Sequence, residues 1–214
     1  MKSFNSCFYS FACFLIGIYA RIVFRLHIIG HENIPRAGGI IVASNHLSYL
    51  DIPLLAYSIG RDADYMAKKE LFSIPVLGLL IRILGGFPVD RERLDRSTIR
   101  EAIKRLKSGR VLVIYPEGTR SPNGRLQPAK PGVGMIVRMS GVKVIPVAVT
   151  GTDKALPRGS WMVRRAHITI EFGKPIDFSS MVEDTGEKGD IGKITEIIME
   201  KISTLINSHV PVPK

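Results

Sequence analysis

The sequence predicts an α/β fold, a single domain with a mostly parallel central sheet flanked by helices. Residues 40–43 and 111–115 are continuous apolar runs, typical of strands buried on both faces. Between them, Ile99, Ala102 and Leu106 recur at the spacing of one helix face. The chain has 214 residues, no internal repeat and no long linker, so it can bury one sizeable core.

An apolar segment precedes this domain. Residues 4–20 carry no charge and Arg21 ends the run, which as a helix is shorter than the roughly 30 Å core of a bilayer. A signal peptide and a buried core helix compete, but the run lacks a good cleavage site and has aromatic residues on all sides. We expect residues 1–21 to form an N-terminal membrane-associating helix that dips into one leaflet, and residues 22–214 to form the domain.

The net charge of +11 and the isoelectric point near 9.9 indicate an anionic partner. The basic residues are spread along the chain, and the lone Trp161 has no aromatic neighbours in sequence. Nucleic acid is therefore not expected, and an anionic membrane surface or a phosphorylated substrate is favoured.

The cysteines indicate neither a disulfide scaffold nor a metal site. Cys7 and Cys13 lie six residues apart in the apolar segment, too far for a disulfide if it is helical. No Cys/His ligand spacing occurs, so we expect no metal, and a reducing compartment fits.

Periodicity and turn signals place the remaining elements. We expect strands over residues 22–28, 40–43, 64–68, 85–91, 111–115, 142–149 and 166–172, the last at a sheet edge. We expect helices from near Tyr49 and over residues 74–84, 98–107, 130–139 and 191–206.

The most informative stretch is residues 44–51, Ser-Asn-His-Leu-Ser-Tyr-Leu-Asp. His46 follows a buried strand, where open α/β sheets place their chemistry. Ser48 and Asp51 fit a capping box, which puts Asp51 in the first helical turn, leaning back toward the loop. A carboxylate bonded to one imidazole nitrogen raises the basicity of the other, so His46 would be a general base for a substrate hydroxyl.

The same pair also has a purely structural interpretation. Asp51 can simply cap the helix and His46 can be a satisfied loop histidine, which for a lone His-x4-Asp is the more frequent case. Residues suited to an anionic substrate elsewhere in the chain decide between the two.

Such residues follow the second apolar strand. The strand over residues 111–115 delivers Glu117, Gly118, Thr119 and Arg120 to the same sheet edge. An arginine fork matches phosphate oxygens, and we expect the glycine to free backbone N–H groups. A base, a phosphate cradle and an apolar end together indicate a hydroxyl-bearing phospholipid precursor as substrate.

Four blocks, in order, resemble those of the glycerolipid acyltransferases, the PlsC-like 1-acyl-sn-glycerol-3-phosphate acyltransferase family. They are Asn45-His46-x4-Asp51, residues 86–91, Glu117-Gly118-Thr119-Arg120-Ser121 and Val144-Ile145-Pro146-Val147. The resemblance covers about residues 26–175. It implies transfer of an acyl chain from acyl-CoA or acyl-carrier protein to the sn-2 hydroxyl of lysophosphatidate, giving phosphatidate, with no other cofactor. It also implies an enzyme of phospholipid biosynthesis at the cytoplasmic face of the cell membrane.

The resemblance also assigns roles to residues. His46 would be the base and Asp51 its orienting partner, and residues 144–147 would belong to the acyl site and core. The residues expected to bind the glycerol phosphate are Arg91, Glu117, Gly118, Thr119 and Arg120, with Lys68, Lys69 and Lys130 as further contacts.

Three alternatives stay open. Ser44 or Ser48 could act as a nucleophile, although no G-x-S-x-G elbow exists. The acceptor could be another lysophospholipid or an amino-acid lipid. A non-catalytic peripheral protein that binds anionic lipid would explain the charge but gives His46 and Asp51 no task.

Overall fold

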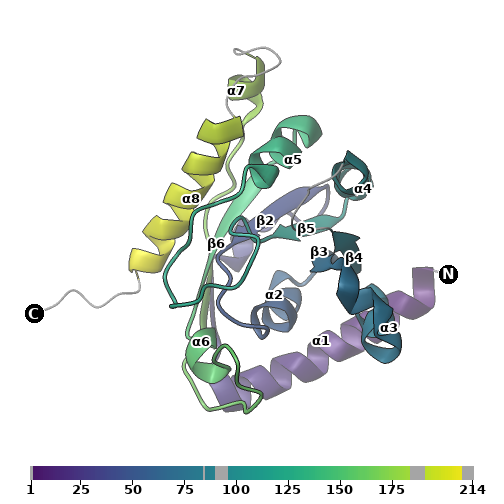
Figure 1. The fold of residues 1–214 in the computed structure, drawn as a ribbon, viewed down its shortest axis with the longest axis vertical. Coiled ribbons are helices and arrows are strands. Elements are labelled where there is room, and N and C mark those ends of the chain that lie inside the picture. The colour runs from purple at the N-terminus through teal and green to yellow at the C-terminus, as the bar shows by residue number, and fades with distance from the viewer. Residues whose placement is uncertain (1, 84, 90–95, 184–190, 209–214) are drawn as a thin grey trace, which may run out of the picture.

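A central sheet carries helices on both of its faces (Figure 1). The computed structural model describes residues 2–83, 85–89, 96–183 and 191–208. Within these residues, seven strands lie in the order β1-β7-β6-β2-β5-β3-β4. Every neighbouring pair is parallel except β6 and β7, which are antiparallel. The predicted mostly parallel α/β sheet is therefore confirmed.

The element bounds agree with most of the sequence predictions. The strands are β1 (His27–Ile29), β2 (Ile40–Ser44), β3 (Ala63–Lys68), β4 (Gly86–Val89), β5 (Val111–Ile114), β6 (Val144–Thr150) and β7 (Thr169–Phe172). The helices are α1 (Lys2–Phe24), α2 (Asp51–Ile59), α3 (Pro75–Ile83), α4 (Arg96–Lys107), α5 (Gly132–Ser140), α6 (Thr152–Ala155), α7 (Ser179–Glu183) and α8 (Ile191–Ser208).

The N-terminal helix is longer than predicted, so the strand expected over residues 22–28 is wrong in its first half. Ala20 and Phe24, one helical turn apart, are both buried in the core, and this contact extends α1 to Phe24. Arg25 then takes a left-handed φ of 44° and ends the helix. Among the described residues, no helix combines the length and the apolar character needed to cross a bilayer.

The prediction that β7 lies at a sheet edge is also wrong. β7 lies between β6 and β1 and pairs with both. Its alternation has another cause, because alternate residues of β7 are buried and the residues between them are only half-buried. A strand whose two faces are covered unequally shows this pattern whether or not it has two neighbours.

Two apolar layers fill the two faces of the sheet. On one face, α1 and α2 pack against alternate strand residues such as Val42 and Val113. Gly17 of α1 lies so close to the Tyr57 ring of α2 that an added Cβ would come within 2.2 Å of it. On the other face, α4, α5 and α8 cover Ile41 and Leu112. The carboxyl ends of β2 and β5 therefore emerge together between the layers, where the loops after them can meet.

Candidate active site

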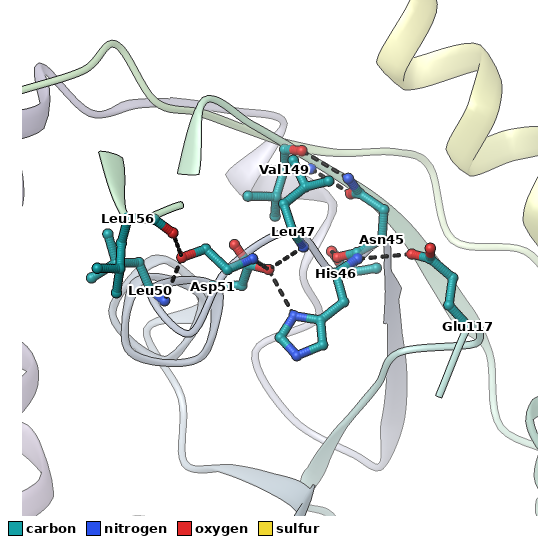
Figure 2. A network of polar contacts seen from close by, with 10 residues as sticks. Asn45, His46, Leu47, Leu50, Asp51, Glu117, Val149 and Leu156 are labelled. Atoms are coloured by element: carbon teal, nitrogen blue, oxygen red, sulfur yellow. Dashed lines mark hydrogen bonds and ion pairs between the residues drawn. The ribbon is translucent and has the colours of Figure 1, made fainter. Parts of the chain in front are cut away.

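The loop between β2 and α2 is organised around one buried carboxylate, that of Asp51 (Figure 2). Its Oδ2 lies 2.8 Å from His46 Nδ1 and accepts the N–H groups of Leu47 and Ser48 at 2.7 and 2.9 Å. Because this carboxylate oxygen accepts every contact, His46 Nδ1 carries the hydrogen and Nε2 is left as the proton acceptor. The side chains of Asp51 and His46 are 0% and 4% exposed.

The predicted capping box is only half formed. Ser48 N–H donates to Asp51, but the Ser48 hydroxyl donates to the Leu156 carbonyl at 2.9 Å. The hydroxyl also accepts the Leu50 N–H at 3.3 Å, whereas the Asp51 N–H that a full capping box would direct to it donates to the Ser48 carbonyl at 3.2 Å. Residues 49–50 form a turn and the regular helix begins at Asp51, two residues after the expected start near Tyr49.

The Glu117 side chain joins this loop to the one after β5. Its Oε1 accepts the His46 N–H and its Oε2 accepts the Gln127 N–H, both at 2.9 Å. In the other direction, Ser121 N–H donates to the His46 carbonyl at 2.7 Å. Burial raises the pKa of Glu117 from its ordinary 4.5, and the two backbone donors oppose that rise. The two loops expected to share one sheet edge are thus in direct contact.

An aromatic ring that the sequence did not single out supports the histidine. Tyr115 stacks on His46 with ring centroids 4.0 Å apart and planes 16° from parallel. Burial, followed by the charge of Asp51, raises the pKa of Tyr115 well above 10. Its buried hydroxyl has no hydrogen-bond partner within the described part of the chain. Its place at the end of an apolar strand was the only available signal.

The imidazole borders a cavity of about 390 Å³ at the carboxyl end of the sheet. In Figure 2 the ring points out of the polar network, and its second nitrogen takes part in no marked contact. The polar and loop portions of the cavity lining include His46, Tyr115, Gly118 and Lys130. The apolar lining includes Met66, Val89, Val113, Val133 and Ile136. A proton acceptor therefore opens onto a mostly apolar space with a cation at its wall.

Gly118 has two local tasks. Its φ of 71° is left-handed, and an added Cβ would lie 3.0 Å from Lys130 Cδ. The glycine thus lets the Lys130 side chain lie across the loop. Its own N–H is not free, as the sequence had suggested, because it donates to the Tyr115 carbonyl at 2.9 Å.

The other predicted contacts are spread around this centre. Neither Arg120 nor Thr119 lines the cavity; the Arg120 guanidinium lies 3.6 Å from the ring centroid of Tyr49, and Thr119 is exposed. Lys68 and Lys69 are exposed and do not line the cavity, and Lys68 Nζ lies 3.5 Å from Glu70. Arg91 lies outside the described residues.

The fourth block belongs to the core. Val144, Ile145 and Val147 are fully buried in β6 and do not line this cavity, so their place in the core is observed, and the acyl-site role of residues 144–147 stays a prediction. Asn45 ties the loop between β2 and α2 to the same strand, because its amide donates to the Val149 carbonyl and accepts the Val149 N–H, both at 2.8 Å.

Comparisons with known proteins point to one family. The sequence profile of the family described as Acyltransferase matches residues 25–150. The 1-acyl-sn-glycerol-3-phosphate acyltransferase of Bacillus subtilis is 31% identical over 180 residues, which are 82% of this chain and 85% of that protein. A chloroplastic enzyme of the same name from Arabidopsis thaliana is 33% identical over 165 residues. That match covers 75% of this chain and 46% of the plant protein, so the chain spans about half of that relative.

A solved structure extends the likeness to the whole chain. The crystal structure of the 1-acyl-sn-glycerophosphate acyltransferase PlsC from Thermotoga maritima superposes with a TM-score of 0.76 at 27% identity. The superposition covers 99% of this chain and 85% of that one. The resemblance first seen in four short blocks is confirmed, and the chain belongs to the acyltransferase family.

Proposed function

We propose that the protein transfers a fatty acyl chain from a thioester carrier, acyl-CoA or acyl-carrier protein, to the sn-2 hydroxyl of lysophosphatidate, giving phosphatidate. The observation that carries this proposal is the His46–Asp51 pair, 2.8 Å apart, with its imidazole on the wall of an apolar cavity. The names of the relatives, which are 1-acyl-sn-glycerol-3-phosphate acyltransferases, support the choice of acceptor.

The proposed reaction needs only one proton acceptor. His46 Nε2 takes the hydroxyl proton as the acceptor oxygen attacks the thioester carbonyl carbon. The new C–O bond forms, the C–S bond breaks, and the imidazolium returns the proton to the departing thiolate. The Asp51 carboxylate faces the imidazolium while it exists and stabilises it. General-base help of this kind is worth about 10²–10⁴ in rate.

The serines near the histidine are engaged elsewhere, which favours direct attack over a serine acyl-enzyme. The Ser44 hydroxyl donates to the Asn45 carbonyl at 3.0 Å, and the Ser48 hydroxyl donates to the Leu156 carbonyl at 2.9 Å. Both serines are buried. A thiolate is a good leaving group, so the acceptor can displace it without a covalent intermediate.

Charge and volume suggest where the substrate would bind. The cavity of about 390 Å³ falls within the range of small-molecule sites, and its apolar lining suits an acyl chain. Lys130 and Arg120 would bind the phosphate, with Arg91, Lys68 and Lys69 as further candidates. We assign Glu117 a positioning task, because both its oxygens bind backbone N–H groups and a carboxylate repels phosphate.

We propose that α1 lies in the surface of one leaflet. Its inner side packs on α2 and the sheet through Gly17, Ala20 and Phe24. Its outer side carries a stripe of exposed apolar residues at helix-face spacing, namely Phe11, Phe14, Leu15, Ile18, Tyr19 and Ile22. A helix that is apolar on both sides, one of them packed on the protein, suits an in-plane position at the membrane.

A transfer assay tests the proposal. Labelled acyl-CoA and acyl-carrier protein would each be offered with lysophosphatidate and, for comparison, with other lysophospholipids. We expect His46→Ala to lower the transfer rate by about 10²–10⁴ with unchanged thermal unfolding. His167→Ala, at an exposed histidine that does not line the cavity, is the matched control and should keep the wild-type rate. Wild-type transfer by His46→Ala would refute the assignment of the base.

A further inference from the structure

The chain's only tryptophan is on the surface, in a loop that the site does not use. Trp161 is 92% exposed, and the two residues after it, Met162 and Val163, are 63% and 38% exposed. Three consecutive exposed apolar side chains, one of them an indole, leave a large apolar area in water. We propose that residues 157–165, the Trp161 loop, insert Trp161 into the headgroup region of an anionic bilayer.

Hydrogen bonds hold this loop in a defined shape. Ser160 N–H donates to the Pro157 carbonyl at 3.0 Å across a turn in which Gly159 has a left-handed φ of 83°. The N–H of Met162 donates to the Ser160 hydroxyl at 3.1 Å. Arg164 N–H returns the chain to the Ala155 carbonyl at 2.7 Å. The apolar residues are thus held outward by a fixed turn, so little conformational entropy would be lost on insertion.

The charges around the tryptophan select an anionic bilayer as the occupant. Four basic residues and no acidic one lie between positions 154 and 165. They are all exposed: Lys154, Arg158, Arg164 and Arg165. Indoles prefer the headgroup level of a membrane, where an apolar ring and a polar N–H are both satisfied. Arginines beside such a ring meet the phosphates of acidic lipids.

The loop is connected to both halves of the candidate site. The Leu156 carbonyl, directly before the loop, accepts a hydrogen bond at 2.9 Å from the Ser48 hydroxyl in the loop between β2 and α2. Arg158 Nη1 donates to the Arg120 carbonyl at 3.4 Å. After the loop, Ile168 N–H donates to the Phe24 carbonyl at 3.1 Å, which places the loop beside the end of α1 (Figure 1). Insertion would therefore hold the loop after β5, which carries Arg120, at the lipid surface. This consequence rests on the proposed function, in which Arg120 binds the phosphate of the acceptor.

The single tryptophan makes the insertion directly measurable. Fluorescence of the full-length protein would be recorded with vesicles of equal parts phosphatidylglycerol and phosphatidylcholine, and with pure phosphatidylcholine. We expect a blue shift, and quenching by lipids brominated near the headgroup, only with the anionic vesicles. Arg164→Gln with Arg165→Gln should lower partitioning about thirty-fold. Lys193→Gln with Lys201→Gln, an equal charge change at exposed positions on α8, is the matched control and should leave partitioning near wild type.

The outcomes separate this inference from the proposed function. His46→Ala should show the same blue shift as wild type, since insertion needs no chemistry. Protein that sediments with anionic vesicles while the Trp161 emission stays that of a hydrated indole would overturn the inference, leaving α1 as the contact. Failure to bind these vesicles would overturn it as well. Trp161→Ser should transfer at the wild-type rate when lysophosphatidate is in detergent micelles and lose transfer when it is in vesicles. A variant that transfers at the same rate from micelles and from vesicles would refute the idea that insertion holds Arg120 at the lipid surface.

Discussion

Two aspartates at opposite ends of the sheet are equally buried, but their carboxylates contact different chemical groups. Asp51 follows the carboxyl end of β2 and Asp64 lies near the amino end of β3, and both are 0% exposed. Asp51 contacts an imidazole and two backbone N–H groups. Asp64 contacts two guanidinium groups, Arg110 Nη2 at 2.8 Å and Arg105 Nη1 at 2.9 Å.

The difference lies in the partner and not in the burial. Arginine keeps its charge under all conditions, so the Asp64 cluster is a fixed ion network. That network joins β3 to α4 and β5, and Arg105 also lies 4.6 Å from the ring centroid of Phe87 in β4. The imidazole of His46 can gain and lose a proton, and it borders a cavity. In this protein, therefore, the chemistry of the partner and not the burial separates the proposed functional carboxylate, Asp51, from Asp64.

Among the substitutions that test this difference between Asp51 and Asp64, we expect the largest effect on the rate of acyl transfer from Asp51→Asn. Asp51→Asn keeps an oxygen that can accept from Leu47 and Ser48, but it removes the charge facing the imidazolium and favours the wrong tautomer of His46. We expect the rate of acyl transfer to fall by about 10⁴, with little change in thermal unfolding. A variant that unfolds easily but transfers at the wild-type rate would make Asp51 a structural residue like Asp64.

At Asp64 we expect the opposite result, a loss of stability without a loss of transfer. Asp64→Asn leaves two arginines beside a neutral amide, and we expect the free energy of unfolding to fall by about 3–5 kcal/mol. Transfer per folded molecule should be unchanged. Asp62→Asn is the control, because that carboxylate is half exposed and lies 3.7 Å from Arg110, so its loss should cost less than about 1 kcal/mol. Urea denaturation of wild type and the two variants measures both losses of unfolding free energy, and the transfer assay measures the rate per folded molecule.

A substitution at Arg120 tests whether the Asp51 end of the sheet, besides holding its own carboxylates, also binds the phosphate of a substrate. A charged hydrogen bond is worth about 1.5–3 kcal/mol, so Arg120→Ala should raise KM for lysophosphatidate roughly ten- to hundredfold. An unphosphorylated monoacylglycerol should be affected much less. The exposed Arg125, farther along the same loop, serves as the matched control. Equal losses for both acceptors would exclude a phosphate role for Arg120.

The smallest effect concerns a third buried carboxyl, Glu117, whose partners are backbone N–H groups. Because burial raises its pKa above 4.5, the folded protein holds this proton more tightly than the unfolded chain. The contribution of Glu117 to stability is therefore full below pH 4.5 and lost as the pH rises through the raised value. The stability difference between wild type and Glu117→Gln should change across this window, measured by urea denaturation at several pH values. A difference independent of pH would contradict this.

Periodicity predicted the centre of the fold better than its margins. Strands such as β2 and β5 are buried throughout and, apart from Ser44, apolar, because both faces are covered, and this signal is local. The end of α1 and the position of β7 were mispredicted because each depends on a neighbour far away in the sequence. Phe24 continues the helix by packing into the core, and β7 gains β1 as a second partner.

The candidate site shows the same division. The spacing from His46 to Asp51 predicted their contact because both belong to one short loop. The stacking of Tyr115 on His46 depends on the register of two strands, in which Ala43 pairs with Ile114 and so brings the residues that follow them together. The walls of the cavity come from β3, β4, β5 and α5, and no local pattern specifies how these meet.

The most direct test of the account is a double-mutant cycle on the paired imidazole and carboxylate, read as the rate of transfer to lysophosphatidate. Residues that act as one unit lose their effect together, so the account predicts that His46→Ala combined with Asp51→Asn is no slower than His46→Ala alone. Losses that multiply, with the double variant slower by the product of the two single effects, would show that Asp51 acts independently of His46 and would contradict the account.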